Sequence, residues 1–196
     1  MKKQHSLILT LVLLFSANQN VTAQIGTKLH DIRHDKFLNF FSFDTTKAFR
    51  TSAFVVRPFA PKFKKSITLE IKLGEDSVIT SLELGLQKGF LDTDWIAARD
   101  IAKNFLRQMT EPRDSLLIND LANQIEFVID RDVLYAGGVP KLPAEPTADY
   151  LAFIGKTDSY TKQLSHTELQ IKNATRDKIP WLTMRLVLIA RTGAGK

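Results

Sequence analysis

The sequence predicts an α+β domain built from an antiparallel sheet of about five to seven strands with a pair of helices packed on one face. Apolar and polar residues alternate over 67–73 and 79–86, which is typical of strands with one covered face and one face in water. Between residues 95 and 125, apolar residues instead recur every three or four positions, as on the buried side of a helix. Strand-like segments lie before and after this helical stretch, and that order favours an α+β fold.

Residues 1–23 have the three parts of an export signal. Lys2 and Lys3 supply the positive start, residues 7–15 the apolar run, and Val21-Thr22-Ala23 the small residues of a cleavage site. The apolar run has about half of the ~20 residues that a membrane-spanning helix needs. We therefore expect a signal peptide cleaved after Ala23, a periplasmic or extracellular location, and no transmembrane segment in the cleaved protein.

The rest of the chain has the composition of a globular domain, with 44% hydrophobic and 24% charged residues overall. We expect a partly ordered N-terminal segment at 24–51, a single α+β domain at 52–190 and a flexible tail at 191–196. The chain has no cysteine, which excludes disulfides, thiolate metal sites and cysteine nucleophiles. Packing alone is therefore expected to hold the fold together.

The first strands of the domain are predicted from Phe- and Val-rich and from alternating segments. Residues 52–59 form the first predicted strand, and Pro58 and Pro61 place its end at a sheet edge or exit because proline cannot donate to a strand ladder. The alternating segments at 67–73 and 79–86 are predicted to form a hairpin around the turn Gly74-Glu75-Asp76.

A first helix is predicted to begin near Trp95, with Asp92 or Thr93 as its N-cap, and to end before Pro112. Charged and amide side chains occupy its other side, so this helix is expected to pack on one face only. The residues predicted to face the core are Trp95, Ala98, Ala102, Phe105 and Met109.

A second helix is predicted from Asp114 or Ser115. Its end is left open, because Phe127-Val128-Ile129 suits either a continued helix or a new strand. The residues predicted to face inward are Leu117, Ile118, Leu121, Ala122 and Ile125.

The C-terminal part is predicted to contain one long loop and three strands. Residues 136–148 hold three prolines and two glycines, which disfavour both helix and central strand. Strand-like segments follow at 150–155, 168–173 and 182–190, the last of which becomes wholly apolar, as in a central strand.

His30 and His34 are spaced so that they would share one face of a helix, and histidines at that spacing can bind one metal. No third ligand accompanies the pair in any recognisable pattern. A solvated helix face near the start of the cleaved chain is therefore the favoured interpretation, and no metal or other cofactor is expected.

Other candidate catalytic residues are dispersed. The acid pairs Asp92/Asp94 and Asp130/Asp132 suit acid and base roles only if they are buried and close in space, and His166 has no flanking signature of a serine hydrolase. Helix capping and turn formation explain Asp92 and Asp94 more simply. The sequence therefore predicts no catalytic residue.

Two short C-terminal patterns carry little weight. The tail Thr192-Gly193-Ala194-Gly195-Lys196 lacks the first glycine and the following Ser or Thr of a phosphate-binding loop, which excludes nucleotide hydrolysis of that type. Asn173-Ala174-Thr175 matches a glycosylation sequon, a pattern that also occurs often by chance.

The charge is uneven along the chain. Loss of Lys2 and Lys3 lowers the net charge from +6 to +4, whereas residues 36–65 alone have a net charge of +6. The same window holds eight of the thirteen phenylalanines in the chain, between Phe37 and Phe63. These phenylalanines either fill the core beside a lysine-rich sheet edge or insert into an anionic membrane surface, and the need for bulky core residues favours the core.

The leading functional prediction is an exported, non-catalytic domain that binds a protein or an anionic component of the cell envelope. The predicted contact patch consists of Arg57, Lys62, Lys64 and Lys65. The alternative is a small hydrolase or isomerase, or a small-ligand carrier, with a cleft between sheet and helices and with His166 among its residues. Nucleic acid is not expected as a partner, because no recognition motif is present.

Overall fold

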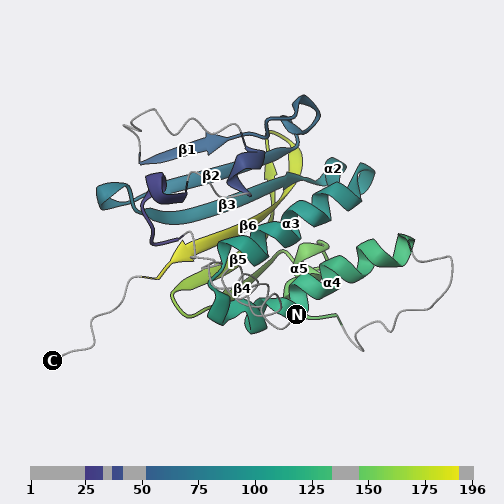
Figure 1. Ribbon diagram of the computed structural model, residues 1–196. Coiled ribbons are helices and arrows are strands. Elements are labelled where there is room, and N and C mark those ends of the chain that lie inside the picture. The colour runs from purple at the N-terminus through teal and green to yellow at the C-terminus, as the bar shows by residue number, and fades with distance from the viewer. Residues whose placement is uncertain (1–24, 33–36, 42–51, 134–145, 190–196) are drawn as a thin grey trace, which may run out of the picture.

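The computed structural model describes residues 25–32, 37–41, 52–133 and 146–189 (Figure 1). Six antiparallel strands form one open sheet in the order β1-β2-β3-β6-β5-β4, and helices pack against it. The predicted α+β class is therefore confirmed. The strands are β1 (Ala53–Val56), β2 (Ile67–Leu73), β3 (Ile79–Gln87), β4 (Ser159–Gln163), β5 (Thr167–Arg176) and β6 (Ile179–Leu188).

In the sequence, the four described α-helices lie between strands β1–β3 and strands β4–β6. The α-helices are α2 (Lys88–Thr93), α3 (Trp95–Met109), α4 (Ser115–Val133) and α5 (Ala148–Phe153). Short 3-10 turns are η1 (Leu29–Ile32), η2 (Leu38–Phe40), η3 (Pro61–Phe63), η4 (Glu75–Ser77) and η5 (Pro112–Asp114). The helical excursion carries the chain from β3, in the middle of the sheet, to β4 at the far edge, and β6 then returns to pair with β3.

The predicted hairpin β2–β3 is confirmed, with Leu69 opposite Leu84 and Ile71 opposite Leu82. All four of these leucine and isoleucine side chains are fully buried, so one face of the hairpin lies in the core. Its turn places Asp76 and Ser77 at positive φ angles of 53° and 60°. Small polar residues tolerate that region better than β-branched ones, which explains why the turn is polar.

The core lies between the sheet and the helix pair α3 and α4. Helix α3 buries Ala98, Ala102, Phe105 and Met109, as the spacing predicts. Helix α4 runs on through Phe127 to Val133, which answers the question that the sequence left open. Two inward assignments are wrong. Leu117 is 44% exposed, because it lies at the edge of the buried stripe in the first turn of α4. Trp95 is half-buried and lies beside Arg99 instead of in the core.

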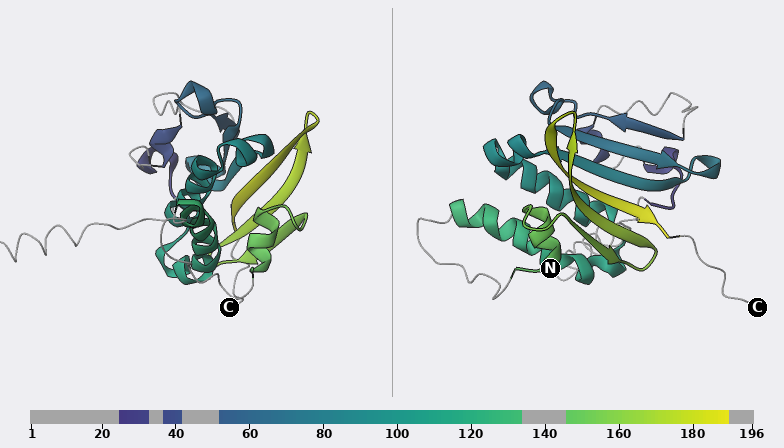
Figure 2. Two further views of the ribbon diagram at one scale, coloured as in Figure 1. Left: turned by 90° about the vertical axis from the view of Figure 1, so that its right-hand side faces the viewer. Right: turned by 180° about the vertical axis from the view of Figure 1, so that it is seen from behind.

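The N-terminal aromatic residues belong to the core. Phe37 and Phe41 are buried, and the Phe37 ring lies 5.8 Å from that of Phe105 on α3. Figure 2 shows η1 and η2 on the same side of the sheet as α3 and α4. Of the two interpretations of this segment, core filling is therefore the one that holds for the described phenylalanines.

Three local predictions are wrong. Residues 150–155, predicted as a strand, lie mostly in α5, because an apolar run this short does not distinguish strand from helix. Strand β4 was not predicted, since its sequence Ser-Tyr-Thr-Lys-Gln has no buried alternation of apolar residues. Asp92 and Thr93 do not cap α3, because β3 continues directly into α2, and Thr93 Oγ1 donates to the Gly89 carbonyl at 2.8 Å.

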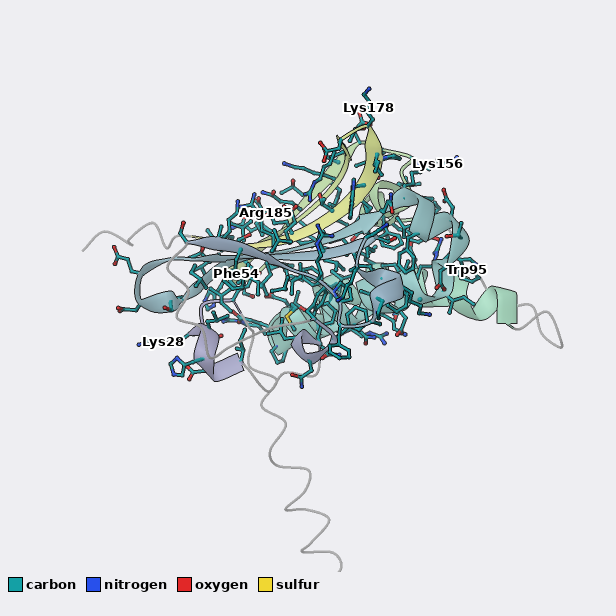
Figure 3. All side chains as sticks on the ribbon, turned by 90° about the horizontal axis from the view of Figure 1, so that it is seen from above. Lys28, Phe54, Trp95, Lys156, Lys178 and Arg185 are labelled. Atoms are coloured by element: carbon teal, nitrogen blue, oxygen red, sulfur yellow. The ribbon has the colours of Figure 1, made fainter. Side chains whose placement is uncertain are left out.

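The second face of the sheet is open and polar, and we call it the open face. Figure 3 shows Arg185 and Lys178 on this side of the sheet and Lys28 on the helix side. The Trp181 ring packs over Gly85 of β3, where a Cβ atom would lie 3.5 Å from the ring and 2.5 Å from Thr68 Oγ1. A side chain at position 85 would displace the Thr68 hydroxyl, whereas its distance to Trp181 is an ordinary van der Waals contact, so the close approach of Thr68 favours glycine.

Several predicted features lie outside the described residues: the export signal at 1–23, His34, most of the 136–148 loop and the tail at 191–196. The division of the chain at residues 23, 51 and 190 stays a prediction. No helix among the described residues combines the length and the apolar character needed to cross a membrane.

Candidate functional site

The basic segment between β1 and β2 forms a compact loop, which we call the basic loop (residues 57–65). Pro58 and Pro61 end the pairing of β1, and the chain then turns through η3. Arg57 Nη1 donates to the Lys64 carbonyl at 2.7 Å, so the two ends of the loop are held together. The sequence-predicted patch residues are therefore brought onto one short turn of chain.

Aromatic contacts anchor the basic loop to the domain. The Phe63 ring lies 5.8 Å from that of Phe40 and 5.6 Å from that of Phe90 on α2. The Phe59 amide donates to the Phe40 carbonyl at 3.0 Å. Half-buried Phe63 and buried Pro58 thus fix the loop to the domain, while its four cations and Phe59 face solvent.

The four patch cations Arg57, Lys62, Lys64 and Lys65 are all exposed. Lys62 Nζ lies 4.4 Å from the centre of the Phe63 ring, a cation–π contact that leaves its charge in place. Among the residues that the structure describes, no carboxylate forms an ion pair with any of the four. The loop therefore presents a concentrated positive charge.

Phe59 lies in the middle of the basic loop and is 76% exposed. This residue was not singled out from the sequence, because the window around it contains many phenylalanines that are buried. The flanking prolines at 58 and 61 were the available signal, since they remove Phe59 from both the strand and any helix. An exposed phenylalanine among four cations is the most distinctive surface feature of the loop.

A shallow groove of about 350 Å³ separates the basic loop from α2. Lys62 and Phe63 line one side, and Phe90 and Asp94 line the other. Asp94 is the N-cap residue of α3, yet its side chain makes no capping hydrogen bond. The groove is therefore mixed in charge, whereas the loop beside it is purely cationic.

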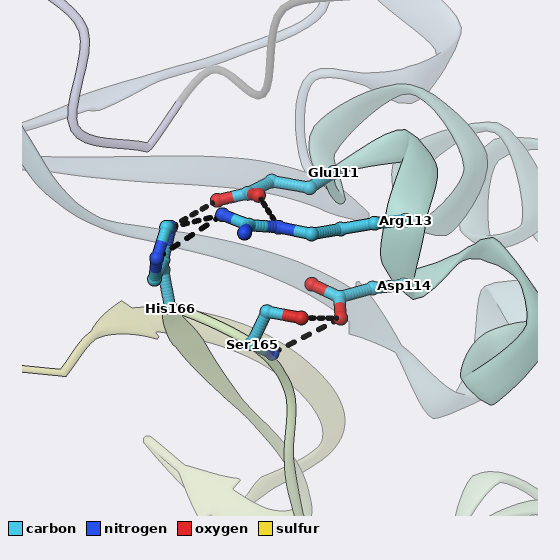
Figure 4. Close-up of polar contacts among 5 residues, drawn as sticks. All are labelled: Glu111, Arg113, Asp114, Ser165 and His166. Carbon is cyan, nitrogen blue, oxygen red and sulfur yellow. Dashed lines mark hydrogen bonds and ion pairs between the residues drawn. The ribbon is translucent and has the colours of Figure 1, made fainter.

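His166 lies far from this groove, in a cluster that joins the α3–α4 connection to the β4–β5 turn (Figure 4). His166 Nδ1 lies 2.9 Å from Glu111 Oε1, and His166 Nε2 lies 3.1 Å from Arg113 Nη2. Arg113 Nη2 also contacts His166 Nδ1, so this ring nitrogen faces both the guanidinium, which can only donate, and the carboxylate, which accepts. Arg113 also pairs with Glu111. Burial raises the pKa of Glu111, but the hydrogen bonds from Arg113 and His166 outweigh it, so the net pKa lies below the ordinary 4.5.

Asp114 and Ser165 form the second half of the same cluster. Asp114 is fully buried, and its Oδ1 accepts from the Ser165 amide at 3.0 Å and from the Ser165 hydroxyl at 2.6 Å. A serine nucleophile passes its proton to a histidine, whereas this hydroxyl is directed at a carboxylate. The arrangement therefore favours a structural role, in which these hydrogen bonds join the α3–α4 connection to the β4–β5 turn at the sheet edge.

The remaining candidate residues have simple structural surroundings. His30 is exposed and its Nε2 lies 2.8 Å from Asp31 Oδ1, and the described ranges contain no cluster of three metal-binding side chains. Asn173 Nδ2 donates to the carbonyls of Ala152 and Thr157, so its amide is used inside the fold. Asp92 lines a small pocket on α2, and the side chains of Asp130 and Asp132 lie outside the described part of the structure.

No protein-family description, no curated protein and no solved structure matches this chain. What the protein does must therefore be inferred from its own residues.

Proposed function

We propose that the protein is an exported, non-catalytic domain that binds an anionic surface of the cell envelope through its basic loop. The observation that carries this proposal is the exposed Phe59 among four exposed cations without ion-pair partners in the described structure. Export is supported by the signal pattern of residues 1–23.

Anionic lipid explains both parts of the loop. Each Lys or Arg close to an anionic bilayer contributes about 1 kcal/mol, and an aromatic side chain adds apolar contact when it enters the interface. An acidic protein would bind the four cations, but such a partner does not explain why Phe59 is 76% exposed among them. The lipid surface is therefore the preferred partner, and the acidic protein is the second candidate.

The interpretation of the aromatic residues changes in one respect. Phe37, Phe40 and Phe41 pack in the core or against it, so they have no part in binding. The proposed membrane contact is instead Phe59, which the prolines on either side hold away from the sheet. Only the loop itself has to approach the surface, and no unfolding of the domain is required.

Vesicle sedimentation tests the proposal. The triple variant K62E/K64E/K65E should lose binding to vesicles made of equal parts phosphatidylcholine and phosphatidylglycerol, while wild type binds them and ignores pure phosphatidylcholine. The matched control is K156E/K172E/K178E, which makes the same charge change at three exposed lysines elsewhere on the domain. It should keep most of the binding.

Equal binding to neutral and anionic vesicles, or undiminished binding of the loop variant, would overturn the proposal. Wild-type protein that ignores both vesicles but is captured by an acidic polypeptide in a loop-dependent way would support the acidic partner instead. All of the substituted lysines are exposed, so each variant should keep its fold. Circular dichroism of each variant checks this.

A further inference from the structure

A second pocket, of about 100 Å³, lies on a different face of α2 from the groove beside the basic loop. Lys88, Leu91 and Asp92 line it from α2, and their spacing of three and four residues places them on one side of that helix. Arg99 of α3, Phe153 and Gly155 around the end of α5, and Asn173 of β5 complete the wall. We call it the cation pocket.

Arg99 is held in place by aromatic side chains. Its guanidinium lies 5.5 Å from the Trp95 ring and 5.8 Å from the Phe153 ring, and Nη1 donates to Tyr150 Oη at 3.5 Å. In the described part of the chain it forms no ion pair. Aromatic rings orient a guanidinium without neutralising its charge, so a half-buried positive charge lies at the wall of the pocket.

Lys88 brings a second cation to the same pocket. A Cβ atom on Gly155 would lie 3.5 Å from Lys88 Nζ and 3.7 Å from Asn173 Oδ1. Gly155 has a φ of +76°, which favours glycine on conformational grounds as well. The absence of a side chain at this position therefore leaves room beside both polar groups.

The wall also contains apolar residues and one acid. Leu91, Ile154 and Leu182 supply apolar surface, and the exposed Asp92 supplies a single negative charge. The planar fork of arginine matches the geometry of a carboxylate. Asp92 opposes a ligand of higher negative charge, and the apolar wall favours a ligand with a short hydrocarbon body.

We infer that the cation pocket binds a small organic monocarboxylate. The carboxylate lies against Arg99 and Lys88, and the hydrocarbon part contacts Leu91 and Leu182. This site shares no lining residue with the basic loop, so the inference stands independently of the proposed membrane binding.

Nuclear magnetic resonance titration tests the inference with butyrate and its uncharged isostere butyramide. Butyrate should shift the indole signal of Trp95 and the Nε–H signal of Arg99, and butyramide should shift neither. The variant R99Q should weaken butyrate binding roughly tenfold or more, because a charge-assisted pair is lost. The control K28Q removes an exposed cation at the other end of the domain and should bind butyrate as wild type does (Figure 3).

If R99Q does not fold, the variant K88Q provides a second test, because Lys88 is exposed and its substitution should not disturb the fold. It should also weaken butyrate binding, by a smaller factor. Three results would overturn the inference: equal shifts with butyrate and butyramide, tighter binding of inorganic phosphate than of butyrate, or wild-type butyrate affinity in the folded Lys88 and Arg99 variants. Unchanged butyrate binding by K62E/K64E/K65E is expected and separates this site from the basic loop.

Discussion

The basic loop and the open face of the sheet are both exposed and rich in charge, but of the two regions only the open face contains ion pairs among the described residues. There, Glu83 pairs with Arg176 and lies 4.0 Å from Arg185, and Glu70 lies 3.2 Å from Lys72. In the basic loop, the cations have no such partners among the described residues. Charge density alone therefore does not distinguish the two regions, whereas ion pairing among the described residues does.

Strand pairing explains the difference. On the open face the register places Glu83 directly opposite Arg185, and cross-strand pairs of opposite charge stabilise a sheet. The basic loop follows the edge strand β1, and the described residues that pair with it, Phe40 and Phe41, carry no acidic side chain. The sheet's charges thus serve the fold, and the loop's charges are left for a partner.

The largest expected effect comes from neutralising the loop. K62Q/K64Q/K65Q should lower affinity for anionic vesicles roughly a hundredfold, at about 1 kcal/mol for each lost cation. The same change on the open face, K72Q/R176Q/R185Q, should leave vesicle affinity within about twofold and lower thermal stability instead. Similar losses of vesicle binding in both variants would remove the distinction between the two regions.

Removal of the exposed aromatic ring should have the next largest effect. F59S is expected to lower vesicle affinity about tenfold, because apolar contact with the interface is lost, and to leave the melting temperature unchanged. Leu116 on α4 is 79% exposed and provides the control L116S, which should keep full vesicle affinity. A fall in the melting temperature of F59S would mean that Phe59 serves packing.

A smaller effect is expected from breaking the charge pairs on the open face. E83Q leaves Arg176 and Arg185 without their carboxylate and should destabilise the fold by about 0.5 kcal/mol, since both arginines are partly exposed to screening solvent. Denaturant unfolding measures this change, which should shrink in high salt. Destabilisation that is independent of salt would argue against an ionic origin.

The smallest predicted effect concerns pH and the His166 cluster. Because the pKa of Glu111 is lowered in the folded protein, its carboxylate stabilises the fold above the ordinary value of 4.5, and this contribution is lost as pH falls through the lowered pKa. E111Q should therefore flatten the acid side of the stability profile by a few tenths of a kcal/mol. An acid slope identical to wild type would assign the loss of stability to other groups.

The elements with strong periodicity could be predicted from the sequence. The β2–β3 hairpin and helix α3 each contain a long regular pattern of apolar residues, and each was found where the pattern places it. Helix α5 and strand β4 are short, and their identity depends on tertiary contacts, such as the hydrogen bond from the Thr147 amide to Gln124 Oε1 on α4. Local sequence does not contain such contacts.

The candidate sites were predictable only where neighbours in sequence are neighbours in space. The cations of the basic loop are close together along the chain, so the sequence alone places them near one another, and their role as a binding patch stays a prediction. The cation pocket joins Lys88, Arg99 and Asn173 from three elements, and no spacing in the sequence relates them. The exposure of Phe59 likewise depends on where the two prolines turn the chain.

The close packing of Trp181 on Gly85 gives the molecule its own optical probes. The chain has two tryptophans, and Trp181 packs against Gly85 on the open face while Trp95 lies beside Arg99. Their fluorescence should therefore report different events: quenching of Trp181 marks occupation of the open face, and a change at Trp95 marks a ligand next to α3. Docking of the basic loop alone should leave both emissions unaltered, and the single-tryptophan variants W95F and W181F assign any change to one ring.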